Sequence, residues 1–446
     1  MSEVPRRTPS SVTRIQGSVP TPAKNFNPFL AQVKPFPTDK EGQYASLYLN
    51  GRLGKNLEDV RTTKNRDEFF SPRPCHLSAA EAIIEAVRKS YENRNPAETR
   101  FAEHINRQNI ALRSRSVEAF PVAMVPGQCI IVSGPLGIGK GAFRQRIRDY
   151  LGMEVVPHRN LSDAIAFTKQ LKYLEIPFPS SGKPEHLIYS MLHGIDSEVK
   201  GVIWDGIQKP TSRTGLLTPQ LFAHAGRVGL GLLYVYGIDA QKLSARSAMD
   251  CLKLLEEFSV VTGVPVVCSA TCAIWALLDG TIASTLKLAS GGIHRFEYIA
   301  LGSDWGNLVN AFLRRFRLTV ADIESSSIRS FQDQVPLLLK SGMKDGADAQ
   351  RSQGDWFATA LIVEAVGLPM LLFVILEELW KIMKIKARNQ TIIEKNDFIR
   401  ASKQYRTKWE GLRANLSILL GKERCSREET MRLSDWILPE QRAHGI

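Results

Sequence analysis

The 446-residue chain has no long uninterrupted apolar run, and no apolar segment follows the basic residues at its N-terminus. Its longest apolar stretch, residues 361–376, contains Glu364, Gly367 and Pro369 and is shorter than the about 20 residues that a membrane-spanning helix needs. We therefore expect neither a secretory signal nor a membrane segment. A buried helix that begins near Pro369 explains the stretch better, because proline is favoured at the first helical position.

Cysteine is also scarce, and no two cysteines form a CxxC pair. Cys268 and Cys272 lie four residues apart, but no second pair of ligands follows at the spacing of a zinc site. We expect no metal site of this kind, and free, buried thiols in a reducing cytoplasm. The six cysteines are Cys75, Cys129, Cys251, Cys268, Cys272 and Cys425.

Acidic residues are in the minority: 45 Asp and Glu accompany 58 Lys and Arg, which gives a net charge of +13 and a pI of about 9.5. This excess favours a polyanionic partner, because neutralising phosphates releases counterions and steers association. Basic globular proteins are common, so charge alone identifies no ligand. The length and the 43% of hydrophobic residues allow two or three domains with a large core.

Composition divides the chain into five segments. A Pro-, Ser-, Thr- and Arg-rich disordered arm is followed by a helical extension, in which Ser78 is the expected N-cap and Glu81 completes a capping box. A core with strand signals comes next, then a helical domain, then a charged tail with the aromatic patch LSDWILPEQ. The segments are residues 1–25, 26–120, 121–303, 304–422 and 423–446.

Four continuous apolar runs in the core predict strands that are buried on both faces of a parallel sheet. They are residues 128–134, 171–179, 230–238 and 263–270, with a fifth strand expected within 296–301. Helical segments alternate with them at 140–151, 184–195, 218–228 and 245–261. This alternation predicts an α/β fold with a mostly parallel sheet.

The most informative motif is GPLGIGKG, which follows a predicted strand and opens a predicted helix. It satisfies GxxxxGK, the pattern of a phosphate-binding P-loop. The backbone at Gly134, Gly137 and Gly139 would wrap phosphate oxygens of ATP, and Lys140 would reach the outer phosphates. Gly141 stands where a Ser or Thr hydroxyl would hold Mg²⁺. A glycine-rich turn without a ligand is the alternative.

P-loop enzymes also need an acidic pair after an apolar strand: an Asp for Mg²⁺ and a Glu that polarises water. Two stretches compete for this role, and neither has the pair. In VIWDGIQ (202–208), Asp205 is followed by Gly206. In LLYVYGIDAQKLS (232–244), Asp239 has no adjacent carboxylate, but the strand is stronger and a helix leads directly into GVPVVCSAT. We therefore favour the second stretch and expect weak or no hydrolysis.

Two further sets of residues are candidates for phosphate contacts. Ser269 or Thr271, at the tip of a predicted strand, stands where a side chain senses the terminal phosphate, although such residues are more often turn or cap residues. Lys242 and Arg246 follow another strand, where loops project from an α/β core. We predict that they contact DNA phosphates, although solvated surface charge explains most basic residues.

The order of these motifs resembles the TnsC/TniB family of AAA+ regulators of heteromeric bacterial transposons. The resemblance covers roughly residues 26–420, with NPFL (27–30) and EFFSPRPCHL (68–77) ahead of the P-loop. YGIDAQKLS stands where the family has IDEIQ-x-LS, and GVPVVCSATCA (263–273) is similar to its GVPVxxxGTxxA. Each stretch is short, but the order and spacing are specific.

The resemblance implies a P-loop AAA+ core with an N-terminal helical extension and a C-terminal helical lid. It implies that Gly134, Gly139 and Lys140 bind ATP, and it places VIWDGIQ in a loop before a helix. Asp239 falls at or beside the family's acidic pair. If Gln241 is aligned with the glutamine of the family's IDEIQ, Ile238 takes the position of the Asp. Thr271 matches the sensor threonine, with Ala270 in place of the family's glycine.

The resemblance also implies partners and location. Family members assemble on double-stranded DNA with ATP and link a target-selecting protein to the transposase. We therefore expect a homo-oligomer, or co-assembly with an active relative, on DNA in the bacterial cytoplasm. Three functions remain open: a DNA-bound adaptor with little hydrolysis, an active ATPase with Asp239 as its only metal carboxylate, and a protein-only scaffold. The scaffold would use LSDWILPEQ and the lid for its contacts.

Overall fold

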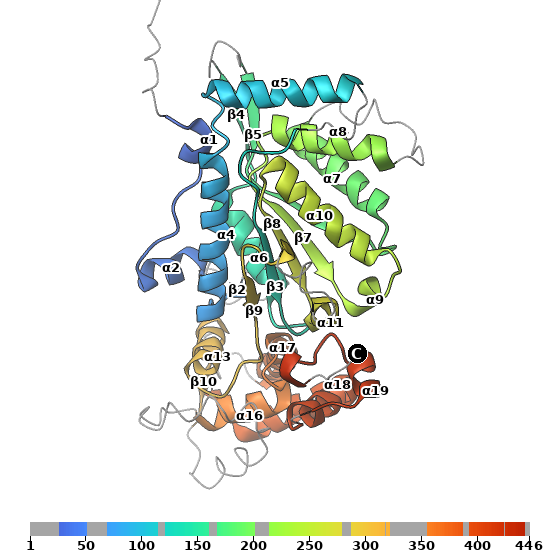
Figure 1. Cartoon of the computed structure of the whole chain (residues 1–446). Coiled ribbons are helices and arrows are strands. Elements are labelled where there is room, and N and C mark those ends of the chain that lie inside the picture. The colour runs from blue at the N-terminus through green and yellow to red at the C-terminus, as the bar shows by residue number, and fades with distance from the viewer. Residues whose placement is uncertain are drawn as a thin grey trace, which may run out of the picture.

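A five-stranded parallel sheet forms the centre of the chain, which is described here from a computed structural model (Figure 1). The structure describes residues 26–50, 69–114, 121–159, 167–200, 214–278, 287–316, 318–321, 355–386, 392–422 and 424–441. The strands, in their spatial order, are β6 (Leu174–Pro177), β7 (Leu233–Ile238), β8 (Val266–Ala270), β3 (Cys129–Ser133) and β9 (Ile293–Arg295). Since β8 lies between β7 and β3, the carboxyl ends of these three strands meet at one edge of the sheet.

Both faces of the sheet are covered, which explains the uninterrupted apolar runs. Along β3, Ile130 and Val132 join the core that contains α6 (Lys140–Leu151). Cys129 and Ile131 point the other way, into the core under α7 (Pro184–Val199), α8 (Thr214–Arg227) and α10 (Ala248–Thr262). Alternate side chains of a strand face opposite sides, so a strand with two covered faces must be apolar throughout.

The four predicted central strands are present, but the fifth was placed wrongly. It is β9, which ends at Arg295 instead of lying within 296–301. As the edge strand beside β3 it is only half-buried, so its sequence, Ile-His-Arg, needs no apolar run. Sequence reasoning also missed an antiparallel hairpin of β4 (Val155–Arg159) and β5 (Phe167–Leu171).

The N-terminal extension is helical, as predicted, but its main helix begins earlier than expected. The helix α4 spans Pro74–Glu92, with Arg73 as its N-cap residue, so Ser78 lies inside the helix. Proline at the first helical position accounts for the earlier start. Figure 1 shows α4 along one side of the sheet and α5 (Thr99–Ser114) across its far end. Shorter elements here are α1 (Pro28–Ala31), α2 (Lys40–Leu47), β1 (Leu49–Asn50) and β2 (Phe69–Phe70).

The helical lid lies below the carboxyl edge of the sheet in Figure 1. It contains α13 (Ser303–Phe316), α16 (Asp355–Ala365), α17 (Pro369–Lys386) and α18 (Lys395–Leu420), with a small parallel pair, β10 (Thr319–Val320) and β11 (Ile392–Ile393). As expected, α17 begins at Pro369 and is largely buried. Among the described helices, none alone is long and apolar enough to span a membrane; residues 356–365 and 369–385 pass that test only as a pair bent by 118°.

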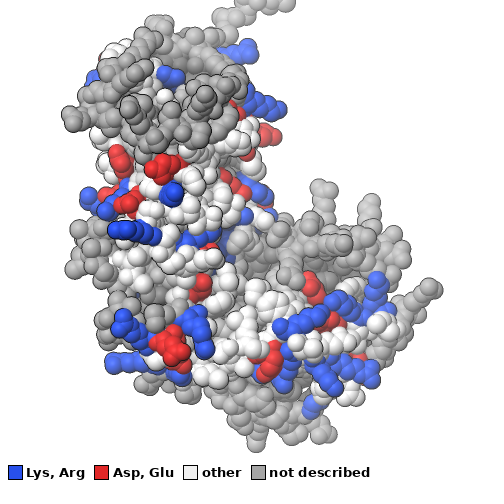
Figure 2. Space-filling model, turned by 90° about the vertical axis from the view of Figure 1, so that its right-hand side faces the viewer, with Lys and Arg blue, Asp and Glu red and all other residues white. Residues whose placement is uncertain are grey.

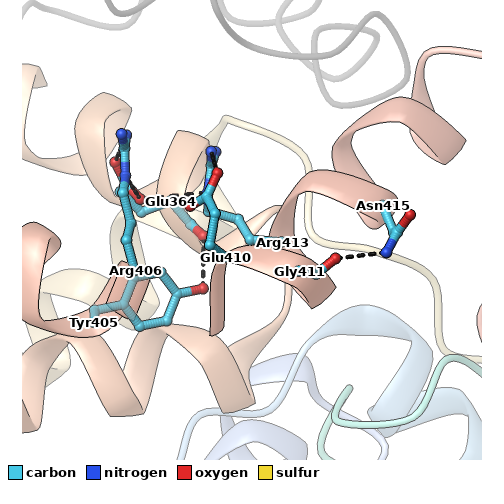
Figure 3. A network of polar contacts seen from close by, with 7 residues as sticks. All are labelled: Glu364, Tyr405, Arg406, Glu410, Gly411, Arg413 and Asn415. Carbon is cyan, nitrogen blue, oxygen red and sulfur yellow. Dashed lines mark hydrogen bonds and ion pairs between the residues drawn. The ribbon is translucent and has the colours of Figure 1, made fainter. Parts of the chain in front are cut away.

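A buried carboxylate ties the lid helices together (Figure 3). The side chain of Glu364 on α16 is 5% exposed, and Arg406 and Arg413 on α18 pair with it. The Tyr405 hydroxyl donates to the Glu364 carbonyl over 3.0 Å, and Glu410 holds Arg413 at 2.7 Å. A buried charge with several charged partners fixes the relative position of two helices, because removing one partner leaves the other uncompensated.

The C-terminal segment packs back onto the molecule. After α19 (Arg427–Arg432), residues 433–438 pass between the lid and the carboxyl edge of the sheet and lead into a 3₁₀ turn, η5 (Pro439–Gln441) (Figure 1). Ile437 is fully buried, the Tyr298 hydroxyl donates to the Trp436 carbonyl over 3.0 Å, and Gln441 donates to the carbonyl of Leu419. The chain thus has the predicted fold class: an α/β core with a parallel sheet and helical regions before and after it. The predicted arm at 1–25 and VIWDGIQ lie outside the described residues.

Candidate functional site

The glycine-rich loop connects β3 to α6 in the geometry of a phosphate loop. Gly137 has φ 89° and Gly139 has φ 104°, backbone conformations that residues with a Cβ rarely adopt. A Cβ at Gly134 would lie 2.2 Å from the carbonyl oxygen of Phe296, so only glycine fits there. Glycine is therefore favoured at all three positions, two by backbone conformation and one by the close approach of Phe296, and glycine-rich turns of this kind can direct N–H groups toward an anion.

Lys140 begins α6 and is half-buried beneath the loop. Its ammonium donates to the carbonyls of Gly134 at 2.6 Å and Pro135 at 2.8 Å. Burial lowers the pKa of Lys140 to about 8, against the opposing influence of Cys272 and Asp435. The lysine thus sits at the loop as predicted, but it is folded back on the loop's own carbonyls.

The predicted magnesium position has no ligand. Gly141 is exposed, and a Cβ added there would meet nothing within 4 Å, so a Ser or Thr would fit without a clash. Among the described residues, no group of three or more His, Cys, Asp or Glu side chains could hold a metal ion. The loop therefore suits phosphate, whereas a glycine takes the position of the usual hydroxyl ligand of Mg²⁺.

The end of β7 carries the favoured acidic candidate, but that carboxylate has a local structural role. Asp239 is the N-cap of a four-residue helix, α9 (Ala240–Leu243), and its Oδ1 accepts from the Lys242 N–H at 2.9 Å. Its Oδ2 lies 3.9 Å from the Lys242 ammonium, which also donates to the Gly237 carbonyl at 2.7 Å. Ile238, the alternative position for the Asp, is fully buried among apolar side chains. Neither register provides a carboxylate pair.

Thr271 follows β8 and lies beside this edge. Its N–H donates to the Ile238 carbonyl at 2.8 Å, which brings it next to the end of β7. Ser269, the other predicted sensor, is buried within β8. The Thr271 hydroxyl oxygen also accepts from the Ala273 N–H at 3.4 Å, so this residue caps the 3₁₀ turn Cys272–Ile274, and its role as a sensor stays a prediction.

One acidic residue at this edge escaped sequence reasoning. Asp435, in the C-terminal segment, accepts with Oδ1 from the Ala240 N–H at 2.8 Å and from the Thr271 hydroxyl at 2.5 Å. Its backbone carbonyl accepts from the Leu136 N–H of the glycine-rich loop at 3.2 Å. The only signal in the sequence was that this acid lies inside the aromatic patch LSDWILPEQ. The aspartate is 195 residues from Ala240 and 164 from Thr271 along the chain, so no local pattern could connect them.

A mainly apolar cavity lies beside the glycine-rich loop and was also unforeseen. Its wall joins the loop to the N-terminal extension and the lid. Arg73 and His76 are among the residues that line it, and their buried Nη2 and Nε2 atoms have no hydrogen-bond partner in the part of the chain that the structure describes. Burial lowers the pKa of His76 well below its usual value, so this imidazole is neutral. The apolar wall includes Phe70, Ile138, Ile299, Leu308 and Phe373.

The two side chains predicted to contact DNA differ in their exposure and in the bonds that they already make. Lys242 already donates to Gly237 and faces Asp239, whereas Arg246 is exposed. Figure 2 shows Lys and Arg interspersed with Asp and Glu on one face, and gathered mainly toward its lid end. Of the two, Arg246 is the one with a guanidinium in solvent.

Comparisons with known proteins add little to this geometry. No protein-family model matches the chain, and no curated protein matches it. Among solved structures, the chain is similar to that of C. elegans PCH-2. The two share 11% sequence identity over 76% of this chain and 72% of the other, with a TM-score of 0.33. A similarity this weak carries no argument about function, so the site has to be interpreted from its own residues.

Proposed function

We propose that this chain is a nucleotide-binding AAA+-type regulator of DNA transposition that hydrolyses ATP weakly or not at all. The observation that carries the proposal is the contrast within one site. The glycine-rich loop retains the backbone shape of a phosphate loop, while the end of β7 has no carboxylate pair. Loss of the metal ligand and of the water-polarising carboxylate removes separate contributions to phosphoryl transfer.

The cavity beside the loop supports a nucleotide rather than a simple phosphate. Its apolar wall suits a flat base, and the buried Nη2 of Arg73 and Nε2 of His76 offer donors to ring nitrogens or carbonyls. A neutral His76 has one N–H to donate; the Arg73 N–H donates to its Nδ1 over 3.0 Å, which leaves the hydrogen on Nε2. An adenine base would thus lie next to phosphates held by Lys140.

The transposition role rests on the resemblance to the TnsC/TniB family. It supplies the expected partners: double-stranded DNA, a transposase, a target-selecting protein, and further copies or an active relative. The net charge of +13 agrees with a DNA partner.

Two other functions are less well supported. An ATPase with Asp239 as sole metal carboxylate conflicts with the capping role of that side chain. A scaffold that binds partners through LSDWILPEQ conflicts with the position of that patch, which packs on the chain's own core.

The decisive experiment measures ATP and ADP binding and ATP turnover of the purified full chain, with and without duplex DNA. We expect measurable binding that Lys140→Ala removes, and turnover near background. DNA affinity should fall steeply with salt, because each neutralised phosphate releases a counterion. Arg246→Ala should weaken DNA binding, whereas Lys253→Ala, on an exposed lysine paired with Asp250, should not. Robust turnover that Lys140→Ala abolishes would sink the proposal, and salt-independent or absent DNA binding would remove its transposition part.

A further inference from the structure

The surroundings of the Asp435 carboxylate consist of hydrogen-bond donors. The Ala240 N–H comes from the end of β7, the Thr271 hydroxyl follows β8, and Lys140 lies close enough to stabilise the opposite charge. The Leu136 N–H of the glycine-rich loop is held by the carbonyl of the same aspartate. Two donors from the ends of two strands thus converge on one carboxylate oxygen, with the charge of Lys140 nearby, and this is the arrangement of an anion site.

We propose that this is the site for the terminal phosphate of a nucleoside triphosphate, and that Asp435 occupies it as an internal competitor. The proposal rests on the proposed nucleotide binding and names what controls it. A carboxylate and a phosphate oxygen accept the same hydrogen bonds, so they cannot share these donors. Their negative charges also repel each other.

The segment that carries Asp435 is held independently of the aspartate. Trp436 accepts a hydrogen bond from Tyr298, and Ile437 is fully buried beside it. Gln441 anchors the following turn to Leu419 and Lys422 at 3.0 Å each. These contacts present the carboxylate to the donors at high effective concentration, which an incoming triphosphate must overcome.

The opposite role for Asp435 is that it replaces the missing acid after Asp239 and assists the nucleotide. Its contact with the Ala240 N–H places it near that position. However, an assisting carboxylate needs to face a metal or a water, whereas Oδ1 is bound by two donors of the kind that hold phosphate. The two roles predict opposite effects of removing the carboxylate.

The test measures dissociation constants of ATP, ADP and pyrophosphate for the full-length wild type, Asp435→Ala and Asp435→Asn. Glu440→Ala is the matched control, because it removes an exposed acid from the same segment. We expect Asp435→Ala to tighten ATP binding about tenfold, as when a charged hydrogen-bonded competitor is removed. The affinity for ADP should rise less than that for ATP. Asp435→Asn should raise the ATP affinity by part of this amount, and Glu440→Ala should bind ATP as the wild type does.

Hydrogen exchange supplies a second measurement that uses no variant. ATP added to the wild type should speed exchange of the amides in residues 433–438 as the segment is displaced. Weaker or unchanged ATP binding by Asp435→Ala, or ATP binding without faster exchange, overturns the inference and leaves nucleotide binding intact. If Asp435→Ala binds ATP and the wild type does not, the inference is supported, and the wild-type site is closed to the nucleotide. If no form binds ATP or pyrophosphate at millimolar concentration, both the inference and the proposed nucleotide binding fall.

Discussion

At the end of β3, the glycine-rich loop has a backbone shape that suits a phosphate. Gly137 and Gly139 adopt positive φ, Gly134 fits against Phe296, and Lys140 lies beneath the loop. At the end of β7, along the same edge of the sheet, Asp239 caps its own short helix and contributes no catalytic pair. The difference teaches that binding and hydrolysis are separable, because backbone donors hold an anion whereas bond cleavage needs particular carboxylates.

The largest effect expected from this comparison is the loss of the P-loop lysine. Lys140→Ala should weaken ATP binding by about a hundredfold or more, since it removes a charge-assisted contact in a half-buried site. Lys242→Ala, on the β7 side, should leave ATP affinity within about twofold, because its ammonium is already bound by Gly237. Calorimetric titration of both variants with ATP measures the two effects. Equal losses of ATP affinity would contradict the contrast between the ends of β3 and β7.

A change of pH should alter ATP affinity by the next largest amount. Burial lowers the pKa of Lys140 to about 8, so the ammonium is charged at pH 7 and loses its proton as the pH rises through 8. Phosphate binds the charged form, so ATP affinity should be fully present below about pH 7 and fall about tenfold by pH 9. Titrations across this range on the wild type and Lys140→Met test it; a slope that persists in the variant would assign the effect to another group.

Restoring the missing metal ligand should have a smaller effect. Gly141 has open space around the position of a Cβ, so Gly141→Ser introduces a hydroxyl without a clash. We expect a gain in ATP affinity of about fivefold that depends on Mg²⁺ and disappears in EDTA. Gly141→Ala is the control for the helix itself, and turnover should stay near background because the carboxylate pair is still absent. An equal gain in EDTA would mean that the hydroxyl contacts phosphate directly.

The smallest effect concerns the acid on the β7 side. Asp239→Ala removes the cap of α9 and should lower the free energy of unfolding by about 1 kcal/mol. It should leave ATP turnover unchanged, whereas an active ATPase with this single metal carboxylate would lose its activity. Urea unfolding and a turnover assay on the same preparation separate the two roles.

Sequence reasoning reached the elements whose signal is local. The strand at 129–133, the glycine-rich turn and the helix from Lys140 each follow from the residues in one short window. It failed for β9, whose Ile-His-Arg sequence reflects an edge position that only the strand order reveals. It also failed for the start of α4, where Pro74 set the first turn and the Ser78–Glu81 pattern proved to be internal.

The candidate site divides in the same way. Gly134, Gly139 and Lys140 were identified because a phosphate loop is built from consecutive residues. Asp435, Arg73 and His76 were not, because they approach the loop from segments far away in the chain. No window of sequence contains both sides of such a contact.

By itself, the sequence determined that the chain can form an α/β P-loop core with helices before and after it, because periodicity, glycine positions and buried runs are properties of neighbouring residues. Only the tertiary structure decided that Asp239 is a helix cap and that the Ala240 N–H and the Thr271 hydroxyl donate to a carboxylate of the chain itself. The physical reason is that a donor's partner is set by packing of the lid and the C-terminal segment against the sheet edge.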